Sequence, residues 1–455
     1  MLFNSYAFLL VFLPAAIAIH RIVDPYPELR TWTLVLLSLA FYSYWNPWFV
    51  TLLIASILIN WLAARWYAAT KSGAIVTAAI AGNLAVLGFF KYTNFLLDNL
   101  ELVTGAPLGH LQVALPLGIS FFTFHHIMYL VDLRRGKTGT FPLDRYALYI
   151  CFFPQAIAGP LARWWQVMDQ FGRRAFGPGW ERRCALGVVF IVIGLIEKVF
   201  LGDQLGDLAG PIFNYAKTAP VTDGSAWFAF AFGFQIFFDF SGYSDIAIGL
   251  ALIFGIELPQ NFNAPFRAKN IQDFWTRWHM TLTFFLRDYL FLRLCDVRFA
   301  GKRNVLAAIL ITMALCGLWH GAGWTFVLWG TLHGCALAFA AVWPRFAPSP
   351  GVAVTRTATI GFHFLTSIVF GAGTLTGAWH IYSGFAYLPS LTQVVDAWIL
   401  GVAALCVLLP SSQDLALRLT ERPRTAMAGA MALVAAAVLV RLGNGETYEF
   451  IYFQF

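Results

Sequence analysis

The sequence predicts an all-α polytopic membrane protein, because the chain is apolar and its apolar residues form long runs. Hydrophobic residues make up 59% of the 455 residues and charged residues only 12%, about half the charged fraction of soluble domains. The runs are continuous rather than alternating, as in membrane helices and unlike the strands of a barrel. Since a helix crosses the hydrocarbon core with about 20 mostly apolar residues, we expect about ten to twelve membrane segments.

The apolar runs follow one another along the whole chain. The clearest internal ones cover residues 31–45, 74–90, 185–196, 305–318 and 426–440. The first run, within residues 1–21, lacks the basic start of a signal peptide, so we expect it to be retained as a membrane helix. No polar linker or internal repeat is evident, which predicts one integral-membrane domain over residues 1–455.

The charged residues and the cysteines indicate loops and free thiols rather than a nucleic-acid or metal site. Basic residues gather within residues 132–183 and 267–303, which the positive-inside tendency places on the cytoplasmic side. The net charge of +7 then reflects basic loops, and no nucleic-acid partner is expected. The six cysteines show no CxxC spacing, so we expect free buried thiols and no metal.

Residues 271–293 have the pattern of one amphipathic helix. At about 100° per residue, the charged side chains of this stretch fall on one side and most of its aromatic and leucine side chains on the other. Such a helix is expected at the membrane interface or against the protein core. His279 falls on the border of the apolar face, which predicts that its ring points inward.

Three apolar stretches, residues 114–122, 152–163 and 317–324, contain proline or glycine. Such breaks free backbone groups that must be satisfied inside the protein or by water in a cavity. They predict re-entrant segments around an aqueous tunnel, and simple helix kinks are the alternative interpretation.

Histidines are the strongest candidates for chemistry. His320, in GLWHGAGW, lies inside an uncharged run, where an ionisable residue is functional by default. A neutral imidazole can take a proton from a hydroxyl and return it, and the neighbouring glycines allow a substrate or a backbone to approach closely. The alternative is a core histidine bonded to a carbonyl.

The other histidines are weaker candidates. His279 suits a ring that reaches a buried cavity, although an interfacial histidine beside tryptophans is the alternative. His333 follows His320 by 13 residues, so on one continuous helix the two rings face apart. His380, in the third Trp-His dipeptide, is interpreted as structural or exposed.

A polar cluster is predicted within residues 237–262. Asp239 and Asp245 do not share a helix face, so an acid/base pair of carboxylates is not expected. Asp239 with Ser241 or Tyr243 forms either a buried polar network or a hydroxyl-binding wall of a tunnel. No P-loop, GxGxxG, GxSxG or HExxH motif is found, so phosphate hydrolysis, dinucleotide redox chemistry, serine hydrolysis and zinc proteolysis are unsupported.

Several blocks of the chain resemble the membrane-bound O-acyltransferase family, in particular its bacterial alginate O-acetyltransferase branch. The resemblance rests on LPLGISFFTF, FFPQAIAGPLAR, DFSGYSDIAIGLALIFGI, LPQNFNAPFRAKNIQDFWTRWHM and GLWHGAGWTFVLWG. It runs over nearly the whole chain, although residues 374–384 depart from the family pattern.

The resemblance implies a fold and a reaction. The fold is a ring of tilted transmembrane helices, with re-entrant and interfacial helices, around a central tunnel in the bacterial inner membrane. The family's catalytic histidine corresponds to His320 and its second characteristic polar position to His279. The acetyl group is expected to move from cytoplasmic acetyl-CoA, a substrate rather than a bound cofactor, towards an extracytoplasmic polysaccharide, with a periplasmic acetyltransferase completing the transfer.

The chemistry of a thioester assigns further candidate residues. A thioester needs an oriented hydroxyl, a base and oxyanion donors, but no metal. We expect His320 to be the base and His279 to orient the acceptor or stabilise charge. Trp278, Trp319 and Trp324 are expected to line the tunnel. Three basic side chains are candidates for binding the CoA phosphates: Arg163, Arg267 and Lys269. The alternative is that these cations only set the topology of the chain in the membrane.

Other functions remain open at this point. Within the family, the acyl group and acceptor could be D-alanine and teichoic acid, and the acceptor could also be peptidoglycan or cellulose. A proton-coupled transporter is the alternative from another class, and a catalytically silent scaffold is a third.

Overall fold

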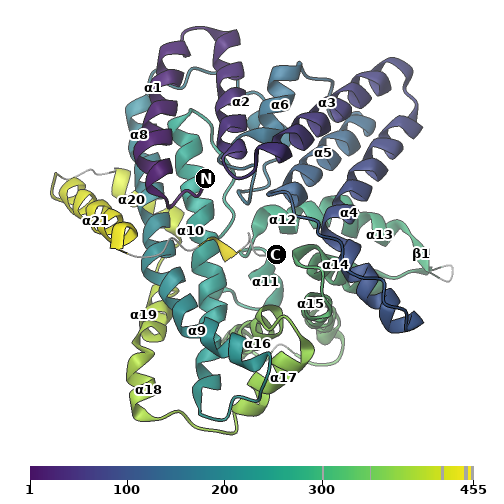
Figure 1. Cartoon of the computed structure of the whole chain (residues 1–455), viewed down its shortest axis with the longest axis vertical. Coiled ribbons are helices and arrows are strands. Elements are labelled where there is room, and N and C mark those ends of the chain that lie inside the picture. The colour runs from purple at the N-terminus through teal and green to yellow at the C-terminus, as the bar shows by residue number, and fades with distance from the viewer. Residues whose placement is uncertain (300–301, 349, 422–424, 445–448, 452–455) are drawn as a thin grey trace. The chain divides into compact units, whose positions relative to one another are not determined.

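The structure, a computed structural model, describes all residues except 300–301, 349, 422–424, 445–448 and 452–455. Nearly all regular structure in the described residues is helical (Figure 1), as the sequence predicts. A short antiparallel pair of strands, β1 (Arg298–Phe299) and β2 (Lys302–Arg303), was not expected.

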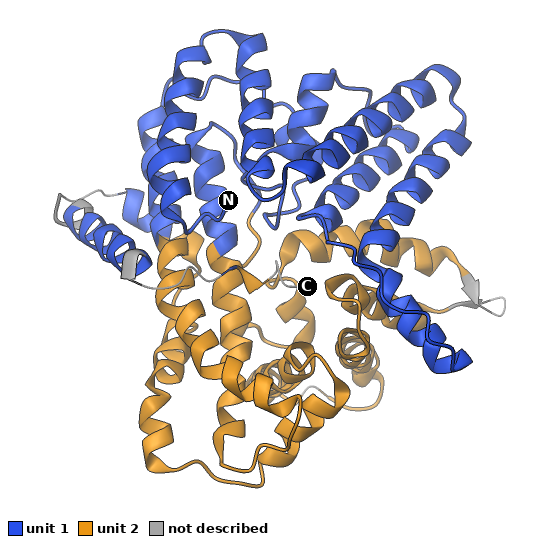
Figure 2. Ribbon diagram, in the orientation of Figure 1, with its two compact units in different colours: residues 1–192, 243–259, 416–449 blue, residues 193–242, 260–415, 450–455 orange. Residues whose placement is uncertain are grey.

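The chain divides into two compact units (Figure 2). Unit 1 comprises residues 1–192, 243–259 and 416–449, and unit 2 comprises residues 193–242, 260–415 and 450–455. The helices α8 (Trp180–Ile196), α10 (Ala231–Ile253) and α20 (Ser412–Glu421) have residues in both units. The expectation of one domain stays a prediction.

The remaining elements belong to one unit each. Unit 1 holds η1 (Ala7–Phe12), α1 (Leu13–Val23), α2 (Pro27–Ser43), α3 (Pro47–Thr70), α4 (Gly73–Thr104), α5 (Ile119–Arg134), α6 (Leu143–Cys151), α7 (Trp164–Val167) and α21 (Thr425–Asn444). Unit 2 holds η2 (Glu197–Gly202), α9 (Asp203–Ala216), η3 (Ser225–Phe230), η4 (Pro265–Arg267), α11 (Ile271–Trp275), α12 (Met280–Phe285), η5 (Leu286–Phe291), α13 (Leu292–Asp296), α14 (Val305–His320), α15 (Trp324–Val342), η6 (Trp343–Arg345), α16 (Val352–Gly371), α17 (Leu375–Gly384), α18 (Leu391–Asp396) and α19 (Trp398–Cys406).

Many of these helices are apolar enough to cross a membrane. Six helical stretches in the described residues meet the requirements of length and composition: Pro47–Thr70, Gly73–Thr104, Trp180–Ala216, Ser225–Ile253, Trp324–Arg345 and Val352–Gly371. Four shorter apolar stretches are Ala7–Val23, Val305–His320, Leu391–Cys406 and Gly429–Leu442. The chain is therefore a multi-pass membrane protein, with fewer full-length spans in its described part than the ten to twelve expected.

The proline- and glycine-containing break at residues 152–163 is a buried non-helical segment of unit 1, not a kinked helix. Residues 152–162 are all buried, so their backbone groups need partners within the protein. The Tyr149 hydroxyl donates to the Ala162 carbonyl (3.2 Å), and the Phe153 amide donates to the Ser38 hydroxyl (3.1 Å). Gly118, which precedes α5, packs here, since a Cβ atom at Gly118 would lie 2.6 Å from the Ala156 carbonyl oxygen.

Glycines also bring α14 and α15 of unit 2 into close contact. A Cβ atom at Gly317 would lie 2.1 Å from the carbonyl oxygen of Phe326, and one at Gly330 would lie 2.1 Å from that of Met313. Small residues allow such close approach of helices in membrane proteins. At Gly317 the close neighbour is the backbone of α15, one of the two possibilities that the sequence raised for the glycines near His320.

The expectation of one continuous amphipathic helix over residues 271–293 is wrong. Helix α11 ends at Trp275, and α12 begins at Met280. Between them His279 adopts a left-handed conformation with φ 43° and ψ 52°, which a non-glycine residue rarely adopts. The helical pattern of the sequence could not show this break, because tertiary hydrogen bonds hold it open.

Candidate active site

Two segments distant in sequence enclose the left-handed turn at His279. The Met280 amide donates to the Asn261 carbonyl (2.8 Å), and the Asn263 amide donates to the Arg277 carbonyl (2.9 Å). These bonds pair residues 261–263 with residues 277–280 in the manner of a short ladder. The ring of His279 is completely buried as a result.

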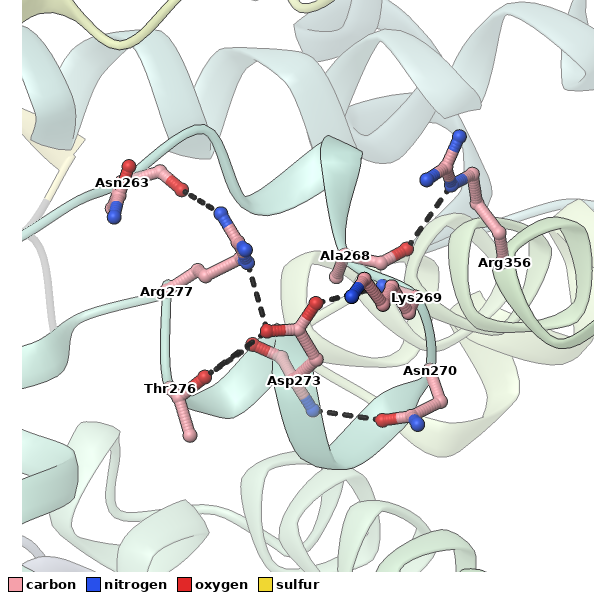
Figure 3. A network of polar contacts seen from close by, with 8 residues as sticks. All are labelled: Asn263, Ala268, Lys269, Asn270, Asp273, Thr276, Arg277 and Arg356. Atoms are coloured by element: carbon pink, nitrogen blue, oxygen red, sulfur yellow. Dashed lines mark hydrogen bonds and ion pairs between the residues drawn. The ribbon is translucent and has the colours of Figure 1, made fainter. Parts of the chain in front are cut away.

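A polar network around Asp273 supports this turn (Figure 3). The Asp273 carboxylate accepts hydrogen bonds from the Lys269 amide (2.8 Å) and from Arg277 Nε (2.9 Å). The Arg277 guanidinium also donates to the Asn263 carbonyl (3.3 Å). Asn270 caps α11 by accepting a bond from the Asp273 amide (2.9 Å), so charged and polar groups on α11 fix the loop that carries His279.

Asn261 determines which nitrogen of the His279 ring carries the proton. His279 Nδ1 lies 3.0 Å from Asn261 Oδ1, and the same oxygen accepts from the Thr281 hydroxyl (2.9 Å) and amide (3.4 Å). Because an amide oxygen only accepts, Nδ1 is the protonated nitrogen and Nε2 is the basic one. Burial lowers the pKa of His279 to about 3, so the ring is neutral near pH 7.

His320 is the last residue of α14 and is 5% exposed. Aromatic rings surround it: Trp319 at 4.8 Å, Trp329 at 5.3 Å and Phe370 at 5.4 Å between centroids. The Trp319 ring lies 6.3 Å from that of His279. The two candidate histidines therefore belong to one aromatic cluster of unit 2, separated by a single tryptophan. The C-terminal end of a helix favours a cation, which suits an imidazolium at His320.

His333 joins this cluster, although a continuous helix would have placed it on the opposite side from His320. The chain leaves the helix between His320 and Trp324, and this break changes the register. Trp329 consequently contacts both His320 and His333, the latter at 4.7 Å. Sequence reasoning also missed His363, whose ring lies 5.1 Å from that of Trp278.

A mostly apolar cavity of about 190 Å³ lies beside the cluster, within unit 2. Trp275 lines it, and its ring packs on Trp329 (6.0 Å) and His333 (5.4 Å). Residues of α11, α12, η5, α14 and α15 complete the wall: Gln272, Thr283, Leu286, Arg287, Phe291, Ile309, Thr312, Met313 and Leu337. Among the described residues, no group of three or more His, Cys, Asp or Glu side chains could hold a metal ion.

The predicted polar residues of α10 have different environments. Asp239 is 2% exposed and pairs with Lys198 Nζ at 2.5 Å, which places it in a buried polar network, the first of the two possibilities raised above. Ser241 is also buried. Tyr243 belongs to unit 1, where its ring stacks on Phe3 at 5.0 Å. Lys198 was not singled out, although a charged pair, Glu197 and Lys198, in an otherwise apolar run was a usable signal.

The structure does not bring all the other candidates together. Trp278 and Trp319 lie in the buried cluster, at 5% and 7% exposure, whereas Trp324 is 57% exposed. Arg267 and Lys269 are exposed residues of unit 2. Arg163 belongs to unit 1, where its guanidinium lies 4.9 Å from the Trp165 ring centroid. Roles in lining a tunnel or binding CoA stay predictions for these residues.

Comparison with known proteins places this arrangement in a family. The profile of the membrane-bound O-acyltransferase family matches residues 133–378, a stretch that contains both candidate histidines and more than half of the chain. The chain therefore belongs to the membrane-bound O-acyltransferase family, and it is an O-acyltransferase.

Relatives with two different acceptors match over most of the chain. The peptidoglycan O-acetyltransferase of Helicobacter pylori is 36% identical over 429 residues, covering 86% of this chain and 81% of the relative. The probable alginate O-acetylase of Azotobacter vinelandii is 36% identical over 403 residues, covering 84% and 77%. The teichoic acid D-alanyltransferase of Streptococcus thermophilus is 30% identical over 241 residues, covering 50% and 57%. Similar identities to the first two do not single out alginate.

Proposed function

We propose that this protein moves an acetyl group from cytoplasmic acetyl-CoA across the bacterial inner membrane towards an extracytoplasmic polysaccharide. One observation carries the catalytic part of the proposal: His279 and His320 are buried in one aromatic cluster, with Trp319 between them. Imidazole rings that are shielded from water and flank one tryptophan are suited to hydroxyl activation.

In the proposed step, His320 is the general base. It takes the proton of an acceptor hydroxyl as the oxygen attacks the thioester carbonyl carbon. The carbon–sulfur bond then breaks, and the proton passes from the imidazolium to the departing CoA thiolate. The position of His320 at the end of α14 stabilises the transient imidazolium.

His279 orients the acceptor in this proposal. With Nδ1 bound to Asn261, its Nε2 accepts a hydrogen bond and cannot donate one to an oxyanion while the ring is neutral. Of the two roles considered for His279, the tautomer favours orientation of the acceptor, through a hydrogen bond from a second acceptor hydroxyl, over stabilisation of negative charge.

The acceptor is the least determined part of the proposal. The names of the relatives include both alginate and peptidoglycan, so we propose an extracytoplasmic polysaccharide and a periplasmic acetyltransferase partner that completes the transfer. D-Alanyl transfer to teichoic acid is supported only by relatives that cover about half of the chain.

The first experiment measures CoA release from acetyl-labelled acetyl-CoA by membranes that contain the protein and its host's acceptors. We expect His320→Ala to lower release at least about a hundredfold, as loss of a general base does. His380→Ala is the matched control, because His380 is also in a Trp-His pair but its Nδ1 donates to the Ala216 carbonyl at 2.9 Å. Equal release by wild type and a stably folded His320→Ala protein contradicts the proposal.

A second experiment identifies the acceptor. After the same incubation, the labelled acetyl group is followed into purified peptidoglycan, soluble exopolysaccharide and teichoic acid fractions. Label in one fraction that disappears with His320→Ala assigns the acceptor. Transfer of labelled D-alanine instead of acetyl contradicts the proposed acyl group.

A further inference from the structure

We propose that Lys198, Asp203 and Asp239 form a buried clamp that anchors the C-terminal segment Phe450–Ile451 on α10 and thereby positions His279. The anchoring of Phe450–Ile451 does not depend on the reaction, whereas the expected effect of the clamp on CoA release rests on the proposed function. All of these residues lie in unit 2.

The clamp is an ion triad inside apolar helices. Lys198 Nζ lies 2.8 Å from Asp203 Oδ1 and 2.5 Å from Asp239 Oδ1. The side chains of Lys198 and Asp239 are 2% and 3% exposed. Charges at such positions are costly unless they are paired and hydrogen-bonded. The triad has two carboxylates for one ammonium, so further donors are needed at the carboxylates.

The C-terminal segment supplies a hydrogen-bond donor to Asp239 and an aromatic ring to Lys198. The Ile451 amide donates to Asp239 Oδ2 at 2.7 Å, the carboxylate oxygen that does not bind Lys198. The Lys198 ammonium also lies 4.7 Å from the centroid of the Phe450 ring, a cation–π contact. Phe450 and Ile451 are 1% and 5% exposed, which indicates a docked segment.

The clamp is linked to the candidate active site by the residue that follows Asp239. The Phe240 ring is perpendicular to that of His279, with centroids 4.6 Å apart. Phe240 thus closes one side of His279, while Asn261 holds Nδ1. A change of α10 at Asp239 is transmitted directly to the ring of His279, so the triad residues and Ile451 are positioning residues.

Carboxypeptidase digestion of the purified full-length protein tests the anchor without any acetyl transfer. Intact mass spectrometry follows the removal of Ile451 and Phe450. Ile451→Pro deletes the donor N–H but leaves every charge in place, and Ile451→Val keeps the N–H as its control. The enzyme is carboxypeptidase Y, which also releases proline, and each rate is divided by the rate for the same variant unfolded. We expect this ratio for removal of residue 451 and Phe450 to be about tenfold higher or more in Ile451→Pro, and near the wild-type ratio in Ile451→Val.

The carboxylate is tested in the same way. Asp239→Leu leaves a balanced Lys198–Asp203 pair and removes the acceptor, so its C-terminal segment should be released as in Ile451→Pro. Asp239→Asn retains an acceptor oxygen and should be intermediate. Asp396→Asn, which changes an exposed carboxylate on α18, is the control. Protection equal to that of the wild type in both Asp239→Leu and Ile451→Pro overturns the anchor.

Two readouts test the positioning of His279. Diethyl pyrocarbonate should modify His279 several-fold faster in Ile451→Pro than in Ile451→Val, since the ring is inaccessible in the wild type. The kcat for CoA release should fall several-fold, with the KM for acetyl-CoA unchanged. An anchor that is released while His279 labelling and kcat stay at wild-type values overturns the positioning role. A wild type that releases no CoA refutes the proposed function, and the digestion and labelling still decide the clamp.

Discussion

At the scale of single residues, the candidate site depends on partners that lie far away in sequence. His279 is 18 residues from Asn261, and its φ of 43° is held by backbone bonds to the same segment. A side chain in this position is neutral, has a defined tautomer and cannot turn its ring without breaking a buried hydrogen bond. Two predictions follow from this environment.

The first prediction concerns Asn261→Leu. The substitution keeps a similar volume but removes the acceptor of His279 Nδ1 and of the Thr281 hydroxyl. With no acceptor to select the tautomer, we expect kcat to fall by about tenfold or more, as expected for the loss of a buried hydrogen bond. Steady-state CoA release measures this loss, and Thr331→Val, which removes a hydroxyl bonded to the Val327 carbonyl of its own helix, is the control. A kcat that is unchanged in Asn261→Leu contradicts the assigned tautomer.

The second prediction is a dependence of stability on pH. Burial lowers the pKa of His279 from 6.5 to about 3, so below pH 6.5 the unfolded chain binds a proton that the folded chain excludes. Stability therefore falls as the pH falls through this window, and by about pH 5 His279 contributes a loss of roughly 2 kcal/mol. The thermal midpoint in detergent, measured from about pH 8 to pH 5, should decrease less in His279→Gln than in the wild type. Identical slopes contradict the lowered pKa.

At the scale of elements, close helix contacts place His320. Gly317 and Gly330 bring α14 against α15 so tightly that a methyl group at either position would overlap a carbonyl oxygen. Since the overlapping atoms are backbone, a side-chain movement cannot relieve the contact. The end of α14, and with it His320, is therefore placed by the helix hairpin.

We expect Gly317→Ala to cost about 1–3 kcal/mol of stability and to lower kcat together with the thermal midpoint, because the helices must separate. Gly82→Ala on α4 is the matched control, since nothing lies within 4 Å of its added Cβ atom and alanine favours a helix. A Gly317→Ala protein with wild-type midpoint and kcat would show that the hairpin does not position His320.

At the scale of the whole molecule, each of the two units contains a buried group of ion pairs, which in unit 2 is the clamp. Only unit 2 contains the candidate histidines. In unit 1, Asp24 is 1% exposed and accepts hydrogen bonds from the Ala175 amide (2.8 Å) and from Arg174 Nε (3.4 Å). Arg30 Nε lies 3.7 Å from the same carboxylate. We interpret the ion pairs of Asp24 with Arg30 and Arg174 as a determinant of the stability of unit 1.

We therefore expect Asp24→Ala to remove about 3–5 kcal/mol, since it leaves the buried Arg30 without its carboxylate. The thermal midpoint should fall by several degrees, whereas the KM for acetyl-CoA, measured well below the midpoint, should stay unchanged. A large change of KM with no change of midpoint would assign Asp24 to the reaction rather than to stability.

The sequence by itself determined the class of the protein and its leading candidate residues. Long apolar runs specify membrane helices through composition alone, and the structure and the comparisons confirm the helical structure and the family. The interruption of the helices at residues 152–163 is also present, whereas a re-entrant course around an aqueous tunnel stays a prediction. His320 was recognisable because an ionisable ring in an apolar run is unusual. The burial of His279 was recognisable from helical spacing, even though the helix itself is broken.

Only the tertiary structure decided which groups meet. The pairing of His279 with Asn261, the contact of Trp329 with both His320 and His333, and the docking of Ile451 on Asp239 join residues that no local pattern relates. The helices are interrupted at His279 and after His320. These interruptions change the helical register, so spacing arguments that assume one continuous helix fail across them. The physical reason is that helical periodicity acts over a few residues, whereas buried polar groups take whichever partners the folded chain brings within hydrogen-bonding distance.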